Sequence, residues 1–164
     1  MLKLLDKKTG TPISEHDLLP EPSKAGFVIV YGTVGTGYQE VCESAFTAAN
    51  FSHRFWKSFN RESNLEQHNA WLMSEVNYGE SGRISDDETA AQLTAMCDLL
   101  HAGMQVFACI HATDPIVRLE AIASNVHMSS DFFKRFKDIL MMVGRREICM
   151  QSGGNVTVTD YLPV

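Results

Sequence analysis

The chain has 164 residues, of which 45% are hydrophobic and 21% charged, and its formal net charge is −6. This length and composition predict one globular domain and exclude a disordered, collagen-like or coiled-coil chain. The longest nearly uncharged apolar stretch, residues 104–112, is about half the roughly 20 residues that a membrane-spanning helix needs. Residues 1–6 do not have the pattern of a signal peptide. We therefore expect a cytoplasmic protein that does not insert directly into a membrane.

The basic residues favour no nucleic-acid partner. Nucleic-acid binding through counterion release needs a clustered basic face. The best cluster in this chain is modest and interrupted by acidic residues, so we interpret it as a solvated helix face and a turn. Its members are Lys134, Arg135, Lys137, Arg145 and Arg146.

The four cysteines, Cys42, Cys97, Cys109 and Cys149, form no Cys-x-x-Cys pair. Without an export signal, we expect all four to be reduced thiols. Cys97 and His101 stand four residues apart on an expected helix, but two ligands do not make a structural zinc site. Core packing is the better interpretation of Cys97, and we predict no metal site.

The first third of the chain predicts an arm, a strand and a helix. Residues 1–24 are polar and contain three prolines, so we expect an irregular arm with one short turn at 14–19. Residues 26–31 are continuously apolar and rich in β-branched side chains, which is typical of a strand buried on both faces. Glycines follow, and residues 38–50 carry the apolar spacing of a helix.

The middle of the chain is less regular. Residues 51–59 could form a short strand, residues 65–76 could form a helix, and residues 79–82 form a loop. Residues 86–101 predict a helix, because Ser85 or Asp86 can cap it and acidic residues occupy its first turn.

The last third completes an α/β pattern. Residues 104–111 predict a second apolar strand, and a helix begins at Pro115 after the capping residue Asp114. Residues 130–143 predict a last helix, and residues 146–162 predict a hairpin around a Gly-Gly turn. These elements indicate a three-layer α/β fold with a partly parallel sheet and a C-terminal β-hairpin.

The glycines between the first strand and its helix have the spacing of a phosphate loop. Such a loop reads Gly-x-x-x-x-Gly-Lys-Ser/Thr, and its backbone N–H groups surround phosphates. In this chain Tyr38 replaces the Lys and Gln39 replaces the Ser or Thr that would hold magnesium. The candidate phosphate-binding residues are Gly32, Gly35, Thr36, Gly37, Tyr38 and Gln39.

The missing Lys weakens the case for a nucleotide. A pair of unit charges 4 Å apart interacts by about 4 kcal/mol at an effective dielectric of 20. Losing the Lys and the magnesium ligand should therefore weaken triphosphate binding by orders of magnitude. From the glycine spacing alone, a tight strand–helix turn without a ligand remains an alternative.

Three segments in order carry a family resemblance. Residues 82–90, Gly-Arg-Ile-Ser-Asp-Asp-Glu-Thr-Ala, resemble the Walker B region of the ATPases of type II secretion, type IV pili and conjugation. That family reads Gly-Glu-Ile/Met/Ser-Arg-Asp-x-Glu-Thr-Ala. Residues 102–113 resemble its histidine box, and residues 156–162 resemble its closing strand. The resemblance covers the C-terminal ATPase lobe and implies a P-loop (RecA-like) domain over residues 25–164, after the arm at 1–24.

The departures from the family pattern fall on the chemistry. Arg83 stands where the family has the Walker B Glu, and we find no Glu-Asp-Pro-like acidic box. The resemblance implies that His111 and Glu88 would be the catalytic residues if the protein were active. His111 could equally be a core histidine hydrogen-bonded at the end of a strand.

These departures predict a degenerate, non-catalytic member of the family. It would bind a secretion, pilus or conjugation motor subunit, or self-associate, and modulate the apparatus. We expect no cofactor, with ATP and Mg²⁺ binding weakly at most. The alternative is a weak ATP-binding or ATP-hydrolysing subunit in which Lys24, Arg54, Arg83 or a neighbouring subunit replaces the missing Lys. A third possibility is an unrelated α/β domain with another ligand.

Overall fold

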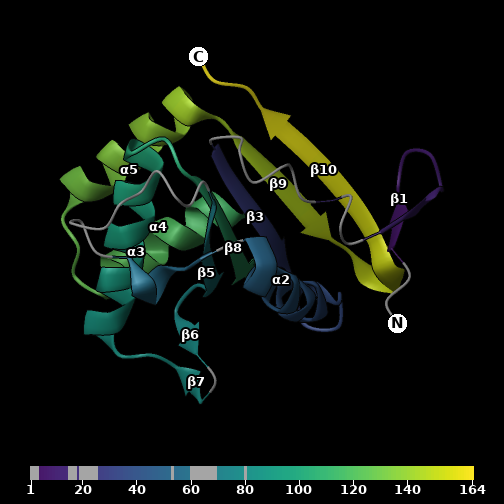
Figure 1. The fold of residues 1–164 in the computed structure, drawn as a ribbon, viewed down its shortest axis with the longest axis horizontal. Coiled ribbons are helices and arrows are strands. Elements are labelled where there is room, and N and C mark those ends of the chain that lie inside the picture. Colours follow the sequence, from purple (N-terminus) through teal and green to yellow (C-terminus); the bar gives the residue numbers. More distant parts are fainter. Residues whose placement is uncertain (1–3, 15–17, 19–25, 53, 60–69, 80) are drawn as a thin grey trace.

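The computed structural model describes residues 4–14, 18, 26–52, 54–59, 70–79 and 81–164. Eight strands form the main sheet in the order β2-β1-β10-β9-β3-β8-β5-β4 (Figure 1). Their bounds are β1 (Leu4–Asp6), β2 (Pro12–Ile13), β3 (Gly26–Gly32), β4 (Arg54–Phe55), β5 (Ala70–Glu75), β8 (Gln105–His111), β9 (Arg145–Met150) and β10 (Asn155–Tyr161). A separate pair, β6 (Tyr78–Gly79) and β7 (Gly82–Arg83), projects beyond the end of β5.

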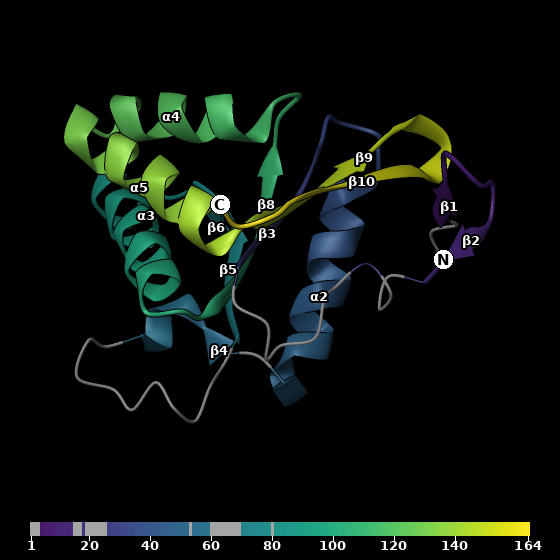
Figure 2. The ribbon, with the colours of Figure 1, turned by 90° about the horizontal axis from the view of Figure 1, so that it is seen from above.

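The helices cover both faces of the sheet. They are α2 (Tyr38–Ser52), α3 (Asp86–His101), α4 (Pro115–Asn125) and α5 (Ser130–Val143), with short 3₁₀ turns η1 (Trp56–Ser58) and η3 (Ser152–Gly154). Figure 2 shows α2 on one side of the sheet and the other three helices on the opposite side. Each side has its own apolar cluster, so the predicted three-layer arrangement is confirmed.

The centre of the sheet is parallel and explains the continuous apolar runs. Strands β9, β3, β8, β5 and β4 all run in the same direction. Phe27 and Ile29 face the cluster under α3 and α5, whereas Val28 and Val30 face the cluster under α2. A strand covered on both faces must be apolar at every position, which is why its sequence does not alternate.

Capping and terminal residues set the helix bounds where the sequence predicts them. The side chains of Ser85, Asp114 and Ser129 accept hydrogen bonds from backbone N–H groups in the first turns of α3, α4 and α5. The predicted helices at 86–101, from Pro115 and at 130–143 are confirmed, as are the strands in 26–31 and 104–111 and the C-terminal hairpin.

The prediction of a helix at 65–76 is wrong within the described residues, because residues 70–75 form strand β5. Ala70, Trp71, Leu72 and Met73 are all buried, and their run is too short and too fully enclosed for an amphipathic helix. Residues 65–69 lie outside the described part of the chain.

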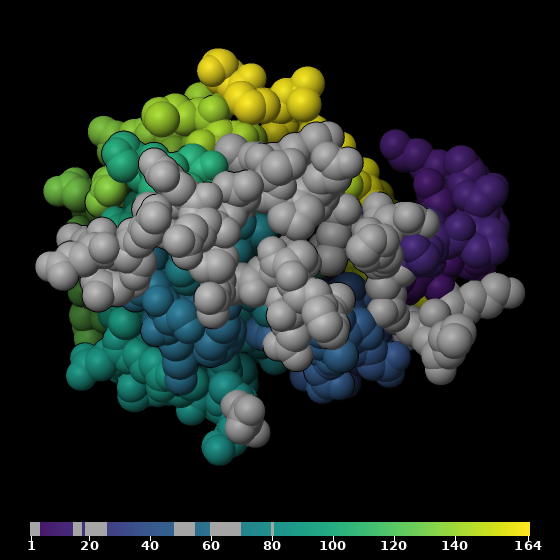
Figure 3. Space-filling view, viewed as in Figure 1, coloured from purple at the N-terminus to yellow at the C-terminus, as the bar shows by residue number. Residues whose placement is uncertain are grey.

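The arm predicted to be irregular also contributes to the sheet. Strand β1 pairs in parallel with β10, and β2 pairs with β1 in an antiparallel hairpin. Both lie at one end of the molecule, coloured purple in Figure 3. The predicted turn at 14–19 falls mostly outside the described residues. In the stretch 51–59, β4 is followed directly by η1, and the predicted loop at 79–82 contributes to the β6–β7 pair.

Candidate functional site

The glycine loop, residues 33–37, connects β3 to α2 at the carboxyl edge of the parallel strands. Gly35 and Gly37 have φ angles of 84° and 86°, which side chains rarely adopt. Gly32 has no room for a Cβ, which would lie 2.9 Å from the Met150 carbonyl oxygen and closer still to Thr36 Oγ1. The three glycines are therefore required by the geometry of this turn.

The loop satisfies part of its own hydrogen-bonding capacity. The backbone N–H and the hydroxyl of Thr36 both donate to the Thr33 carbonyl, at 3.2 and 2.6 Å. A loop that binds phosphate presents such donors to the ligand. In this closed turn, the two Thr36 donors face the chain itself.

Tyr38, the first residue of α2, contacts residues at the ends of two strands, β5 and β8. Its side chain is only 3% exposed. The phenol donates to Glu75 Oε1 at 3.0 Å, and the ring stacks on His111 with centroids 5.8 Å apart and planes 24° apart. Burial raises the pKa of the Tyr38 phenol, and the negative charge of Glu75 raises it further. The phenol therefore stays protonated at neutral pH and acts as the donor.

A bulge in β5 directs Glu75 toward Tyr38. Leu72 pairs with Phe107, but Ser74 pairs with Ala108, so one residue of β5 has no counterpart in β8. This shift of one residue moves the following side chains to the opposite face of the sheet. Glu75 consequently pairs with Cys109 and faces α2, and Ser74 takes a φ of 65° to make the shift.

Side chains from α3 hold the bulged strand in place. Gln92, which is 1% exposed, donates to the Met73 carbonyl at 2.8 Å and accepts from the Asn77 N–H at 3.0 Å. Thr89 donates to Asn77 Oδ1 at 2.9 Å, also in a buried position. A satisfied, buried polar network of this kind fixes the backbone on both sides of Glu75.

A disulfide between Cys42 of α2 and Cys109 of β8 lies beside this group. The expectation of four reduced cysteines is therefore wrong for these two, whereas Cys97 and Cys149 are free. The pair is separated by 67 positions, and the packing of α2 on the sheet brings the two Cα atoms to 6.0 Å. Sequence spacing alone could not show this proximity. Cys97 is fully buried in the core, which confirms the packing interpretation of that residue.

The structure also shows where the other candidate residues lie, which are Glu88, Arg83, Gln39 and His111. Glu88 forms an ion pair with Lys57 of η1. Arg83 lies on β7 and pairs with Asp86. Gln39 is exposed, and so is His111, which is therefore not the enclosed core histidine that the sequence allowed.

Glu75 is a carboxylate that the sequence analysis did not select. It lies at the end of the buried parallel strand β5 and accepts the Tyr38 hydrogen bond. In the sequence, the apolar run at 70–73 just before Glu75 was the sign of a buried strand that ends at this carboxylate. The prediction of a helix at 65–76 hid that position.

Within the described residues, no group of three or more His, Cys, Asp or Glu side chains could hold a metal ion. Across the same residues, no helix combines the length and apolar character that spanning a membrane requires.

No family model and no curated protein matches this sequence. Among solved structures, the chain is similar to the ATPase DotB of Legionella pneumophila, with a TM-score of 0.44 and 11% identity. The match covers 92% of this chain and 50% of the DotB chain, so the protein spans about half the length of that ATPase. Its function must therefore be argued from its own residues.

Proposed function

We propose that this protein is a non-catalytic relative of the secretion ATPases, which binds or modulates a motor subunit of a secretion, pilus or conjugation apparatus. The observation that carries the proposal is the contact of the buried Tyr38 side chain with Glu75 and His111. We propose this family because three sequence segments resemble its motifs. We propose that the protein is inactive because of the Tyr38 contact.

The contact opposes triphosphate binding in two ways. The phenol occupies the position of the phosphate-loop Lys but carries no charge, and Glu75 adds a negative charge beside it. Within the described part of the chain, no Lys or Arg forms an ion pair with Glu75. Phosphoryl transfer depends on neutralising the phosphate charges, so an unneutralised carboxylate repels the ligand that the loop would have to bind.

The nucleotide part of the proposal is tested by calorimetric titration with Mg-ATP. We expect no saturable binding below about 1 mM for the natural chain, because the Lys is missing. Tyr38→Lys should bind at least tenfold more tightly, since a unit charge near phosphate contributes roughly 4 kcal/mol before desolvation. Gln39→Lys adds the same charge one position away and is the matched control. Micromolar binding by the natural chain, accompanied by phosphate release, would contradict the proposal.

The proposed binding to a motor subunit is tested by a separate measurement. Sedimentation of the chain, alone and mixed with a purified motor ATPase from the same cell, would detect self-association or complex formation. We expect a complex that changes the hydrolysis rate of the motor, and we expect Glu75→Gln to leave that change intact because no chemistry by this chain is required. No complex at micromolar concentrations would count against this role.

Glu75 also favours a second candidate, a weak ATP-binding or ATP-hydrolysing subunit. Glu75 lies at the carboxyl end of a buried parallel strand, beside the glycine loop, and carboxylate oxygens are ligands that Mg²⁺ binds. Tyr38 would then have to leave Glu75 when nucleotide binds. In that case Glu75→Gln should abolish phosphate release, whereas the non-catalytic proposal has none to lose.

A further inference from the structure

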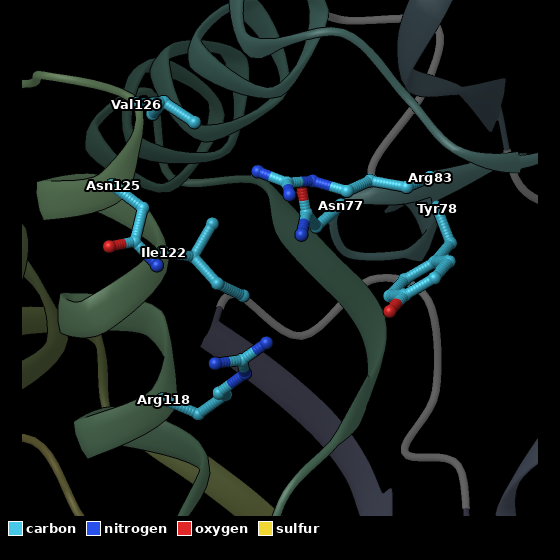
Figure 4. Close-up of a pocket in the computed structure, with 7 residues that line it drawn as sticks. All are labelled: Asn77, Tyr78, Arg83, Arg118, Ile122, Asn125 and Val126. Carbon is cyan, nitrogen blue, oxygen red and sulfur yellow. The ribbon is translucent and has the colours of Figure 1, made fainter.

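A second polar site lies between the β6–β7 pair and α4. It is a hollow of about 90 Å³ (Figure 4). Arg83 of β7 and Arg118 of α4 extend toward it from opposite sides, and Tyr78 lies at its rim. Helical spacing brings Ile122 and Asn125 onto the same face of α4 as Arg118. Segments distant in sequence therefore meet around one opening.

The hollow is positively charged in a protein whose net charge is negative. No carboxylate is among the lining residues in the described part of the chain. Among the described residues, Arg83 forms one ion pair, with Asp86 at 3.4 Å, in which both side chains are more than half exposed. Such a pair contributes little and leaves the guanidinium able to bind another anion. Arg118 forms no ion pair with any described residue, and the nearby Asp114 accepts the N–H of Val117 as the helix cap.

Neutral donors complete the lining. Asn77 is buried, and its Oδ1 accepts from Thr89, which leaves the Nδ2–H donors for other partners. The Tyr78 hydroxyl and the Asn125 amide add further donors. Ile122 and Val126 also line the hollow, but both are buried in the core, so its surface is mostly polar.

We propose that this hollow binds the phosphoryl group of a small organic phosphate. A phosphoryl dianion offers three terminal oxygens, which two guanidinium forks and neighbouring neutral donors can satisfy together. A carboxylate offers two oxygens and a single charge. The volume equals roughly six to nine water-sized spheres, enough for a phosphoryl group but not for a nucleoside.

This site is separate from the glycine loop. Ile122 and Val126 belong to the apolar cluster under α3, α4 and α5, whereas Tyr38 belongs to the cluster under α2. The two sites thus lie on opposite faces of the sheet. A substitution that removes binding at one site should not affect the other. The proposal for the hollow therefore does not rest on the proposed function.

The experiment titrates the full chain with phenyl phosphate, inorganic phosphate and benzoate, and follows the Arg Nε–H signals by NMR. We expect saturable shifts of the Arg83 and Arg118 signals with phenyl phosphate, at a Kd of about 1 mM or tighter. Inorganic phosphate should shift the same two signals, because it carries the phosphoryl oxygens that the two guanidinium groups bind, and benzoate should bind more weakly than phenyl phosphate.

Variants test the assigned residues. Arg83→Gln and Arg118→Gln should each weaken phenyl phosphate binding about tenfold or more, since each removes a charge-assisted contact. Arg118→Lys should also weaken it, because an ammonium lacks the fork geometry. Lys134→Gln, the same loss of charge at an exposed position of α5, should leave binding unchanged.

Three results would overturn the proposal. They are no saturable shift with phenyl phosphate, equal or tighter binding of benzoate, and unchanged binding in a folded Arg83→Gln/Arg118→Gln double variant. Circular dichroism establishes whether each variant is folded.

Discussion

A single side chain, Tyr38, follows the last glycine of the loop and contacts Glu75 and His111. In a phosphate loop the residue after the last glycine is a cation that faces the ligand. Here it is a buried phenol that donates a hydrogen bond to the Glu75 carboxylate. The glycine spacing therefore predicted the local shape of the turn correctly, and weak or absent triphosphate binding stays a prediction.

The Tyr38 hydroxyl should stabilise the fold. Tyr38→Phe removes the donor to Glu75 and leaves a half-buried carboxylate without it, so we expect the free energy of unfolding to fall by about 1–2 kcal/mol. Urea unfolding followed by circular dichroism measures the change. Tyr78→Phe, at a tyrosine that is 39% exposed, is the control and should change stability little. Equal stability of Tyr38→Phe and the natural chain would show that the hydrogen bond does not contribute.

At the scale of elements, the bulge in β5 and the β9–β10 hairpin position the side chains that matter. The bulge reverses the face on which Glu75 lies. In the hairpin, Arg146 opposite Asp160 donates two hydrogen bonds to its carboxylate, at 2.7 and 3.0 Å, and a third to the Leu18 carbonyl. The hairpin thus contacts a residue of the N-terminal arm.

The Arg146–Asp160 pair should make stability depend on pH. The hydrogen bonds from Arg146 lower the pKa of Asp160 in the folded state, despite partial burial. A lowered pKa stabilises the fold above the unfolded value of about 3.9, and the contribution is lost as the pH falls through the folded value. We therefore expect Asp160→Asn to lower the free energy of unfolding at pH 7 by about 0.5–1 kcal/mol, as for an exposed pair.

Urea titrations between about pH 7 and pH 2 measure this dependence, and the difference between the natural chain and Asp160→Asn should disappear at the acid end. Asp138→Asn, at an exposed position of α5, is the matched control and should show no such trend. A difference that persists unchanged at low pH would rule out the ionised carboxylate as its source.

For the whole molecule, the decisive contact is the disulfide that joins the α2 layer to the sheet. It connects Cys42 to Cys109 over 67 positions, two residues before His111. A crosslink of that span restricts the unfolded chain strongly. It also holds α2, and with it Tyr38, against the strand that carries His111.

Reduction should therefore weaken the fold. We expect dithiothreitol, or Cys42→Ser with Cys109→Ser, to lower the free energy of unfolding by about 2–4 kcal/mol. Without reductant, the denatured chain should present two reactive thiols to Ellman's reagent, from Cys97 and Cys149. Cys149→Ser is the control, because it removes a free thiol only. Four reactive thiols before reduction would contradict the crosslink.

The sequence by itself determined the fold class, because its main signals are local. The apolar runs at 26–31 and 104–111 require strands covered on both faces, and Ser85, Asp114 and Ser129 start helices through contacts within one turn. An apolar run such as 70–73 is compatible with either a strand or a buried helix. Its secondary structure therefore depends on the elements that pack against it. The tertiary structure alone placed Glu75 against Tyr38 and Cys42 against Cys109. Both pairs depend on how α2 packs over the sheet, and the first also depends on a register shift that alternation cannot reveal.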